Sequence, residues 1–175
     1  TAYEYNSADN CYNTTSPPSV TRYTLSTEPS AHSGSFTNTV ASSSQINLSY
    51  ATPGNGADGY AILRRSDGTN PSTSGVVDGV APGSWSLPGG TVLVNANATG
   101  TSYNNTGLSA STNYCYLLIP FNWNAANAET YNYRTNATIP TTCGSTPSNT
   151  SDITNDLTYG LTSNINYQTW QTVPP

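Results

Sequence analysis

The chain has 175 residues, a formal net charge of −5 and charged side chains at only 7% of its positions. Its 4 cationic residues are all arginines and form no basic cluster, so nucleic acid and anionic membrane surfaces are poor partners. No run approaches the roughly 20 apolar residues that cross a bilayer, and we expect no membrane span.

Neutral polar residues dominate the composition, with 21 Asn, 28 Thr and 23 Ser. The 13 Tyr and 3 Trp still supply enough apolar surface for a packed core, so we expect an ordered central region. Cysteines at Cys11, Cys115 and Cys143 fit an oxidising compartment, and Thr1 fits a mature form whose export signal has been removed. The sequence therefore predicts a secreted protein, extracellular or on the cell surface.

Three regions follow one another along the chain. Residues 1–27 are polar and Tyr-rich and predict an extended N-terminal arm. Residues 28–143 contain short segments of alternating polarity separated by turns, without a helix-period segment, which predicts an all-β sandwich. Residues 144–175 form a C-terminal tail that alternates again.

The strands of the central region are predicted from alternation. In QINLSY, which begins at Gln45, every second residue is apolar, as a half-buried strand requires. The segment from Ser66 to Gly90 contains 6 Gly and 3 Pro and predicts a long loop or two short edge strands. The other predicted strands are GYAILRR from Gly59, TVLVNA from Thr91, TSYNNTGL from Thr101, YCYLLI from Tyr114 and TYNYRTNATI from Thr130.

The stretch GLSASTNYCYLLIPFN from Gly107 resembles the fibronectin type III signature, in which a Leu, a short polar turn and a Tyr open the sixth strand. TEPSAHSGSF, GYAILRR and GTSYNNTGLSASTNY are similar to modules of secreted proteins from the Bacteroidetes and their relatives. The resemblance implies an immunoglobulin-like sandwich over about residues 28–143. It also implies that Tyr114 is the tyrosine corner, and that Tyr50 faces Tyr60 and Ile62 in the core.

In a sandwich of that family the sixth strand begins and the seventh ends at the same pole. This polarity predicts a disulfide between Cys115 and Cys143. Strand register is expected to leave the two some residues apart, so the chain must curl back after the last strand. Cys115 should point outward, since Tyr114 and Tyr116 take the core face. The main alternative joins Cys11 to Cys143, within one chain or between neighbouring subunits.

The C-terminal tail contains the longest alternation, DITNDLTYGLTSNINYQ from Asp152, with apolar residues at most odd positions and polar residues or Gly at even ones. A typical strand has about five or six residues, so this segment predicts one long strand or two strands bent at Gly160. It either folds back in cis or pairs with another molecule by strand addition. The predicted anchors for strand exchange are Leu157, Tyr159, Leu161, Ile165 and Tyr167.

Catalytic machinery is not predicted. His32 is the one histidine, and no GxSxG motif accompanies it. A zinc site needs three or four Cys or His ligands, and such residues are widely scattered here. Carboxylates at Asp58, Asp67, Asp78 and Glu129 occupy predicted turns, which argues against a glycosidase pair or a calcium site. We expect no enzyme activity, metal or cofactor.

Two surface features remain. Trp85 and Trp123 indicate either a platform on which sugars stack or rings that cover the sandwich or a subunit contact. Asn47 is expected on the outward face of its strand, where a sugar stands clear of the core. Asn-X-Ser/Thr sequons predict glycosylation, with O-linked sugar as the alternative, at Asn13, Asn47, Asn97, Asn104, Asn136 and Asn149.

Three functions are compatible with these patterns: a self-assembling structural subunit, a carbohydrate-binding or adhesive module, and a spacer domain of a larger secreted protein. The strand-forming tail favours the first. We therefore expect a subunit of an extracellular fibre or surface assembly whose main partner is the protein itself, joined by β-augmentation. Carbohydrate is the second candidate partner.

Overall fold

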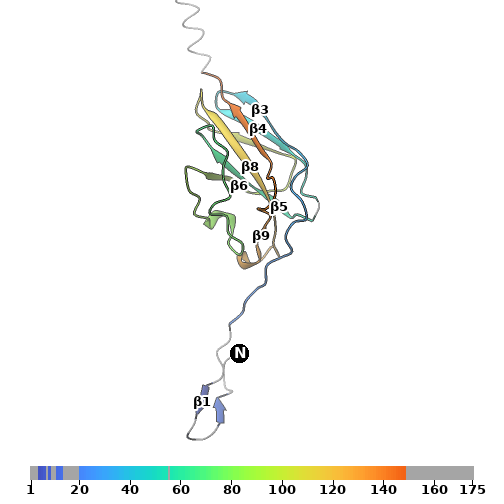
Figure 1. The fold of residues 1–175 in the computed structure, drawn as a ribbon, viewed down its shortest axis with the longest axis vertical. Coiled ribbons are helices and arrows are strands. Elements are labelled where there is room, and N and C mark those ends of the chain that lie inside the picture. Colours follow the sequence, from blue (N-terminus) through green and yellow to red (C-terminus); the bar gives the residue numbers. More distant parts are fainter. Residues whose placement is uncertain (1–3, 7, 9–10, 14–19, 55, 149–175) are drawn as a thin grey trace, which may run out of the picture.

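The chain forms an all-β sandwich of two antiparallel sheets (Figure 1). The computed structural model describes residues 4–6, 8, 11–13, 20–54 and 56–148. The first sheet has the order β3 (Phe36–Ser42), β4 (Gln45–Tyr50), β7 (Ser102–Thr106). The second has the order β10 (Thr141–Ser145), β8 (Asn113–Asn122), β5 (Gly59–Arg65), β6 (Val92–Ala98). The predicted fold class is confirmed.

Several shorter elements complete the described chain. Strand β9 (Asn132–Tyr133) pairs with the end of β8, while β1 (Glu4–Asn6) and β2 (Cys11–Asn13) pair with each other in a separate small sheet. Within the described residues, the helical elements are two turns of 3-10 type, η1 (Pro82–Ser84) and η2 (Ala128–Thr130). In the described residues no helix is long and apolar enough to cross a membrane.

The main core lies between the two sheets, where β4 contributes every second residue. Ile46 and Leu48 are fully buried, and Tyr50 is nearly so. Tyr50 meets Tyr60 of β5 edge to face, with 5.7 Å between ring centroids, and Ile62 belongs to the same cluster. The predicted contact between Tyr50 and the residues of β5 is therefore present.

The turn that precedes β8 is fixed by Tyr114. The backbone N–H of Ser109 donates a hydrogen bond to the Tyr114 hydroxyl at 2.8 Å, and the tyrosine ring is buried. This is the tyrosine corner that the sequence predicted. Arg64 of β5 lies over the same ring, with its guanidinium carbon 5.2 Å from the ring centroid.

A second apolar cluster covers the outer face of the five-stranded sheet, which is formed by β10, β8, β5, β6 and β9. Strand β8 is buried on both faces: Tyr116 and Leu118 belong to the main core, while Leu117 and Ile119 belong to the outer cluster. The long connection between β5 and β6 packs Val76, Trp85 and Leu87 against this outer cluster. The segment predicted as a loop or edge strands is thus a loop that closes a second core.

The predicted strand from Thr130 to Ile139 is present only at Asn132–Tyr133, and its remaining length is wrong. Tyr131 and Tyr133 turn their rings into the outer cluster, where the ring centroids lie 5.6 Å apart. The chain then bends through Ala137, which has a φ of 59°. The last strand of the sandwich starts only at Thr141.

The segment that precedes β3 is tied to the end of the sandwich at which β8 finishes. The Ser26 N–H donates to the Thr130 carbonyl at 2.9 Å, and Arg134 forms an ion pair with Glu28 at 3.0 Å. The described chain leaves the sandwich at this end on the N-terminal side and at the opposite end after β10 (Figure 1). The two chain ends therefore emerge at opposite poles.

Candidate functional site

Cys115 and Cys143 form the predicted disulfide, with an S–S distance of 2.06 Å. The two residues lie directly opposite each other in the pairing of β8 with β10, and their Cα atoms are 4.1 Å apart. The expected offset and the curl of the chain are wrong, because Cys143 lies within the last strand and not beyond it. Cys115 faces away from the main core but is fully buried, and Asn70 of the overlying loop lies 3.4 Å from Cys143 Sγ.

Several of the predicted site residues lie where the structure describes only the backbone or nothing. Cys11 and Asn13 belong to β2, of which only the backbone is described. The predicted anchors Leu157, Tyr159, Leu161, Ile165 and Tyr167 lie outside the described residues, as does the sequon asparagine Asn149.

A seam between β3 and β10 closes one side of the sandwich, and no pattern in the sequence predicted it. Asn38 Nδ2 donates to the Cys143 carbonyl at 2.8 Å and to Thr142 Oγ1 at 2.6 Å. Gly144 lies beneath the same side chain, where a Cβ would collide with Asn38 Oδ1. The glycine thus allows β3 to approach β10, and the asparagine caps a carbonyl of the last strand.

The outward face of the three-stranded sheet carries neutral polar residues and two sequons. Asn47 of β4 lies directly opposite Asn104 of β7. Asn47 is half-buried and accepts a hydrogen bond from Gln45 Nε2 at 2.6 Å, whereas Asn104 is exposed. Because opposed residues have Cβ atoms only about 5 Å apart, a sugar on one asparagine stands against the other. Asn97 and Asn136 are also exposed.

Trp85 and Trp123 are brought to the same face by the outer cluster but do not form an open pair. Trp123 stacks on Tyr131 with 4.7 Å between ring centroids, and Trp85 meets Tyr133 edge to face at 4.8 Å. Tyr131 and Tyr133 stack on each other between them. The four rings form one continuous array, here called the aromatic array, in which each tryptophan uses a ring surface for internal packing.

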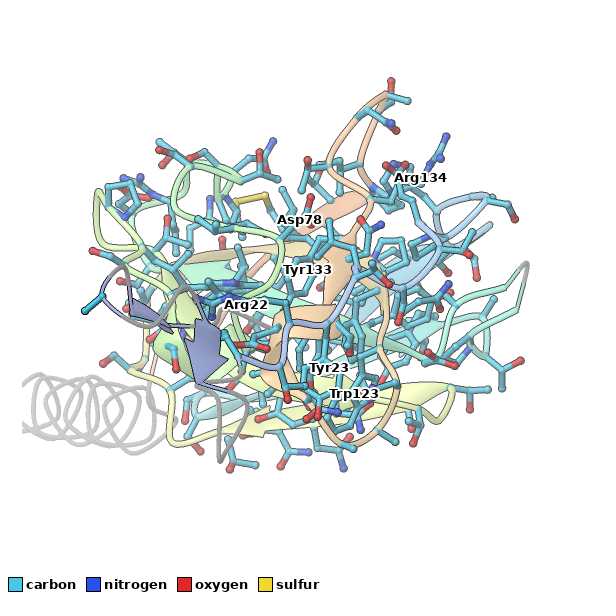
Figure 2. The ribbon with its side chains drawn as sticks, turned by 90° about the horizontal axis from the view of Figure 1, so that it is seen from below. Arg22, Tyr23, Asp78, Trp123, Tyr133 and Arg134 are labelled. Atoms are coloured by element: carbon cyan, nitrogen blue, oxygen red, sulfur yellow. A yellow bond between two sulfur atoms is a disulfide. The ribbon has the colours of Figure 1, made fainter. Side chains whose placement is uncertain are left out.

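Tyr133 is the most enclosed member of the aromatic array. Its hydroxyl donates to the Val80 carbonyl at 2.7 Å. Its backbone N–H donates to Asp78 Oδ1 at 2.8 Å, and both Tyr133 and Asp78 are labelled in Figure 2. Burial, together with the charges of Tyr131 and Asp78, raises the pKa of the Tyr133 hydroxyl far above its ordinary value near 10. The array therefore fastens the β5–β6 loop to the sheet through this tyrosine.

The carboxylates that were considered for catalysis serve the backbone and neighbouring side chains. Asp58 Oδ2 accepts from the Trp123 N–H at 2.9 Å. Asp67 accepts from Arg65 and from Thr69, and these hydrogen bonds hold the pKa of its carboxyl below its ordinary value. In the described part of the chain no group of three or more His, Cys, Asp or Glu side chains gathers in a way that could hold a metal ion.

His32 helps to hold the segment ahead of β3 at the end of the sandwich where β8 finishes. Its Nε2 forms a hydrogen bond with the Asn136 carbonyl at 2.8 Å, and Asn136 Nδ2 donates to Glu28 Oε1 at 3.1 Å. This histidine therefore holds the chain ahead of β3 against the loop that follows β9.

A buried polar contact beneath β7 was also missed by sequence reasoning. Asn105 is buried, accepts from Arg64 Nη1 at 3.3 Å and donates to the Tyr116 hydroxyl at 2.9 Å. Alternation along TSYNNTGL places Asn105 on the inward face, which is the signal that could have found it. The contact joins β7 to the two central strands of the other sheet.

No family model matches the sequence, and no curated protein matches it. Among solved structures, a computationally redesigned β-sandwich protein is 14% identical, with a TM-score of 0.42 over 67% of this chain and 90% of that one. A fibronectin type III-like protein from Clostridium thermocellum is 17% identical, with a TM-score of 0.39 over 68% and 95% of the two chains. A fibronectin type III domain of human collagen α-1(XX) is 15% identical, with a TM-score of 0.41 over 75% and 94%.

Proposed function

We propose that the chain is a structural subunit of an extracellular fibre or surface assembly, joined to its neighbours by β-strand addition. The observation that carries the proposal is that the sandwich closes before the alternating tail begins. Thr146 Oγ1 donates to the Ser109 carbonyl at 2.7 Å, and the Ser111 N–H donates to the Pro147 carbonyl at 3.1 Å. The alternating segment that starts at Asp152 is not needed for these hydrogen bonds, and we infer that it serves to pair with another molecule.

The attachment of the last strand supports a subunit that bears tension. A tail held by a neighbour pulls on β10, the strand from which it continues. The disulfide fastens β10 to β8, and Asn38 fastens it to β3. Force on the tail is thus transmitted to both sheets, and β10 does not separate from the sandwich without β8 and β3 being disturbed as well.

The position of the two chain ends supports linear assembly. The N-terminal segment and the segment after β10 leave at opposite poles (Figure 1). Neighbours that exchange strands between such ends can extend an assembly in one direction. The proposal assigns no catalytic role to the chain, and it places the protein outside the cell, as the resemblance to secreted modules of the Bacteroidetes implies.

The experiment compares charged substitutions on the two faces of the tail. Leu157→Asp with Leu161→Asp places charge on the apolar face, whereas the matched control, Thr158→Asp with Thr162→Asp, places it on the polar face. We expect the first variant to remain monomeric and the control to assemble, by light scattering and negative-stain microscopy. Wild-type protein that stays monomeric at high concentration contradicts the proposal.

Truncation provides a second test. Residues through Pro147 take part in the hydrogen bonds of the sandwich, so the chain is cut after Ser148. The shortened protein should show the wild-type unfolding transition and no assembly. Normal assembly of the shortened protein would exclude the tail as the connector.

A carbohydrate-binding or adhesive module and a spacer of a larger secreted protein are the alternatives. Trp123, which is partly exposed, is the residue on which sugar binding would depend. Tyr131 covers one face of its ring, so at most the other face could meet a sugar. Titration of soluble glycans against tryptophan fluorescence, with Trp123→Phe as the comparison, tests this function separately from assembly.

Glycosylation is a further part of the proposal. The exposed sequons at Asn97, Asn104 and Asn136 are accessible on the folded sandwich. The intact mass of native protein decides the question, because the bare chain has a mass of 18.4 kDa. A mass equal to that value excludes any attached sugar.

A further inference from the structure

The strand that receives the tail can be inferred from the edges of the two sheets. On one side of the sandwich the edges belong to β3 and β10, which lie against each other, and the pairing of β3 with β4 shifts register between Val40 and Ser42. Asn38 of β3 caps the Cys143 carbonyl, and Gly144 brings the two strands into contact. No further strand can pair with β10 there without displacing Asn38.

On the other side, the edge strand of the five-stranded sheet is β6, which is irregular. Its pairing with β5 shifts twice, between Tyr60 and Ile62 and again between Ile62 and Leu63. Side chains also occupy its backbone groups: the Val94 carbonyl accepts from the Tyr103 hydroxyl at 2.8 Å, and the Asn97 N–H donates to Asn95 Oδ1 at 2.9 Å. Bulges and capped groups of this kind protect an edge from strand addition.

Strand β7 is the other edge of the three-stranded sheet, and its pairing with β4 is regular over Ser102–Thr106. The Tyr50 N–H donates to the Thr101 carbonyl at 2.9 Å, so pairs of hydrogen-bonded residues alternate from this point. The alternation directs the N–H and C=O groups of Asn104 and Thr106 away from β4. In the described part of the chain no hydrogen bond reaches these four groups.

The side chains beside this edge suit a strand with one apolar and one polar face. Tyr103 of β7 and Val94 of β6 are only partly buried at the border of the main core, and Val92 is 41% exposed. On the outward face β7 presents Ser102, Asn104 and Thr106. A strand added to β7 would direct alternate side chains toward the border of the core and the others toward the polar face.

We propose that β7 is the acceptor strand for residues 152–168 of a neighbouring copy. The odd-numbered apolar residues of that segment cover Tyr103 and Val94, and its even-numbered polar residues continue the outward face. The backbone of the tail supplies hydrogen-bond partners for the N–H and C=O groups of Asn104 and Thr106. This inference rests on the proposed strand exchange and adds to it the identity of the receiving edge.

The first test removes one edge donor without disturbing the pairing of β7 with β4. Asn104→Pro deletes an N–H that points away from β4, a position where edge strands accept proline. The matched control, Asn104→Gln, removes the same sequon but keeps the N–H. We expect Asn104→Pro to raise the concentration needed for assembly about tenfold or more relative to Asn104→Gln, because a hydrogen bond is lost and the ring obstructs the incoming strand.

If both variants assemble like the wild type, β7 is not the acceptor, although the proposed function stands. If the wild type does not assemble, the proposed function itself is rejected, and the acceptor assignment that rests on it is rejected too. Thermal unfolding of both variants shows whether proline disturbs the sandwich itself. A second measurement, independent of that substitution, uses photo-cross-linking of the full chain.

For cross-linking, p-benzoylphenylalanine replaces Thr106 of β7 or, as a control, Thr37 on the outward face of β3. Equal amounts of ¹⁴N and ¹⁵N protein are assembled together and irradiated. We expect cross-links from position 106 to peptides of residues 152–168 that join light and heavy chains, and none to the tail from position 37.

Two results would overturn the inference. Cross-links to the tail found only within light or only within heavy chains mean that the tail folds back on its own β7, a short route because Thr146 lies beside Ser109. That result also removes strand exchange as the function. Absence of tail cross-links in assembled protein rejects β7 as the acceptor and leaves strand exchange in place.

Discussion

Gly144 of β10 lies directly against the side chain of Asn38 on β3, at a point where any Cβ would overlap the asparagine amide. The same amide donates hydrogen bonds to Thr142 and to the Cys143 carbonyl. Because Gly144 has no side chain, β10 comes close enough to β3 for the Asn38 side chain to join the two strands, which belong to different sheets.

This relationship predicts a non-additive mutational effect. Gly144→Ala should lower the free energy of unfolding by about 1–3 kcal/mol, because Asn38 must move and its hydrogen bonds to β10 weaken. Asn38→Ala alone should cost about 1 kcal/mol. The double variant should be less destabilised than the sum, measured by urea unfolding. Additive losses would mean that the two residues are not coupled in this way.

The disulfide should contribute substantially to stability. Cys115 and Cys143 are separated by 28 residues, for which loop-closure entropy gives about 3–4 kcal/mol. The double variant Cys115→Ala/Cys143→Ala should lose a comparable free energy of unfolding, and reductant should leave its stability unchanged. Equal urea midpoints for the oxidised wild type and the double variant would contradict this expectation.

The β5–β6 loop should behave as part of the folded core. Gly75 has a φ of 90°, and a Cβ there would collide with the Ser86 carbonyl. Gly75→Ala is therefore expected to cost about 1–3 kcal/mol and to lower the melting temperature. Gly83, in the same loop, has open space around it and no positive φ, so Gly83→Ala is the matched control and should change stability little. Equal melting temperatures for the two variants would show that the loop is not packed as described.

The sequence predicted the paired strands well where one face of a strand is buried. In β4, the alternation of Ile46, Leu48 and Tyr50 determined both the strand and its orientation, and β5 was predicted with its observed bounds. Local polarity suffices there because each residue faces either the core or solvent.

The sequence predicted strand β8, but not the layer that covers its outer face. The run from Tyr114 to Phe121 is apolar at odd and even positions alike, which is the pattern of a strand buried on both faces. That signal was available, but the partner of the outer face, a Gly- and Pro-rich loop, has no periodicity from which its packing could be inferred. The last strand was misplaced for a related reason, since Tyr131 and Tyr133 alternate like strand residues but pack into the outer cluster.

The tyrosine corner should contribute a measurable hydrogen bond. Tyr114→Phe keeps the buried ring and removes the acceptor for the Ser109 N–H. We expect a loss of about 1 kcal/mol in the free energy of unfolding. Tyr23, which is 46% exposed, provides the control, because Tyr23→Phe removes a hydroxyl from the surface and should change stability by less than about 0.5 kcal/mol. A similar loss of stability for both substitutions would show that the hydrogen bond between Ser109 and Tyr114 does not stabilise the fold measurably.

Alkaline pH should unfold the sandwich by way of its buried tyrosines. Burial raises the pKa of the hydroxyls of Tyr50, Tyr116, Tyr131 and Tyr133. In the unfolded chain these groups ionise near pH 10, whereas the folded protein keeps them protonated. The folded state therefore binds more protons above that pH, and the free energy of unfolding falls as pH rises.

Tyr133 should account for a resolvable part of this fall. Each retained proton makes the free energy of unfolding decrease by about 1.4 kcal/mol per pH unit, so Tyr133→Phe should show a slope shallower by about that amount above pH 10. Urea unfolding between pH 9 and 11 measures the slopes, and absorbance at 295 nm follows tyrosine ionisation. Identical slopes for Tyr133→Phe and wild type would show that the Tyr133 hydroxyl ionises equally readily in the folded and unfolded chains.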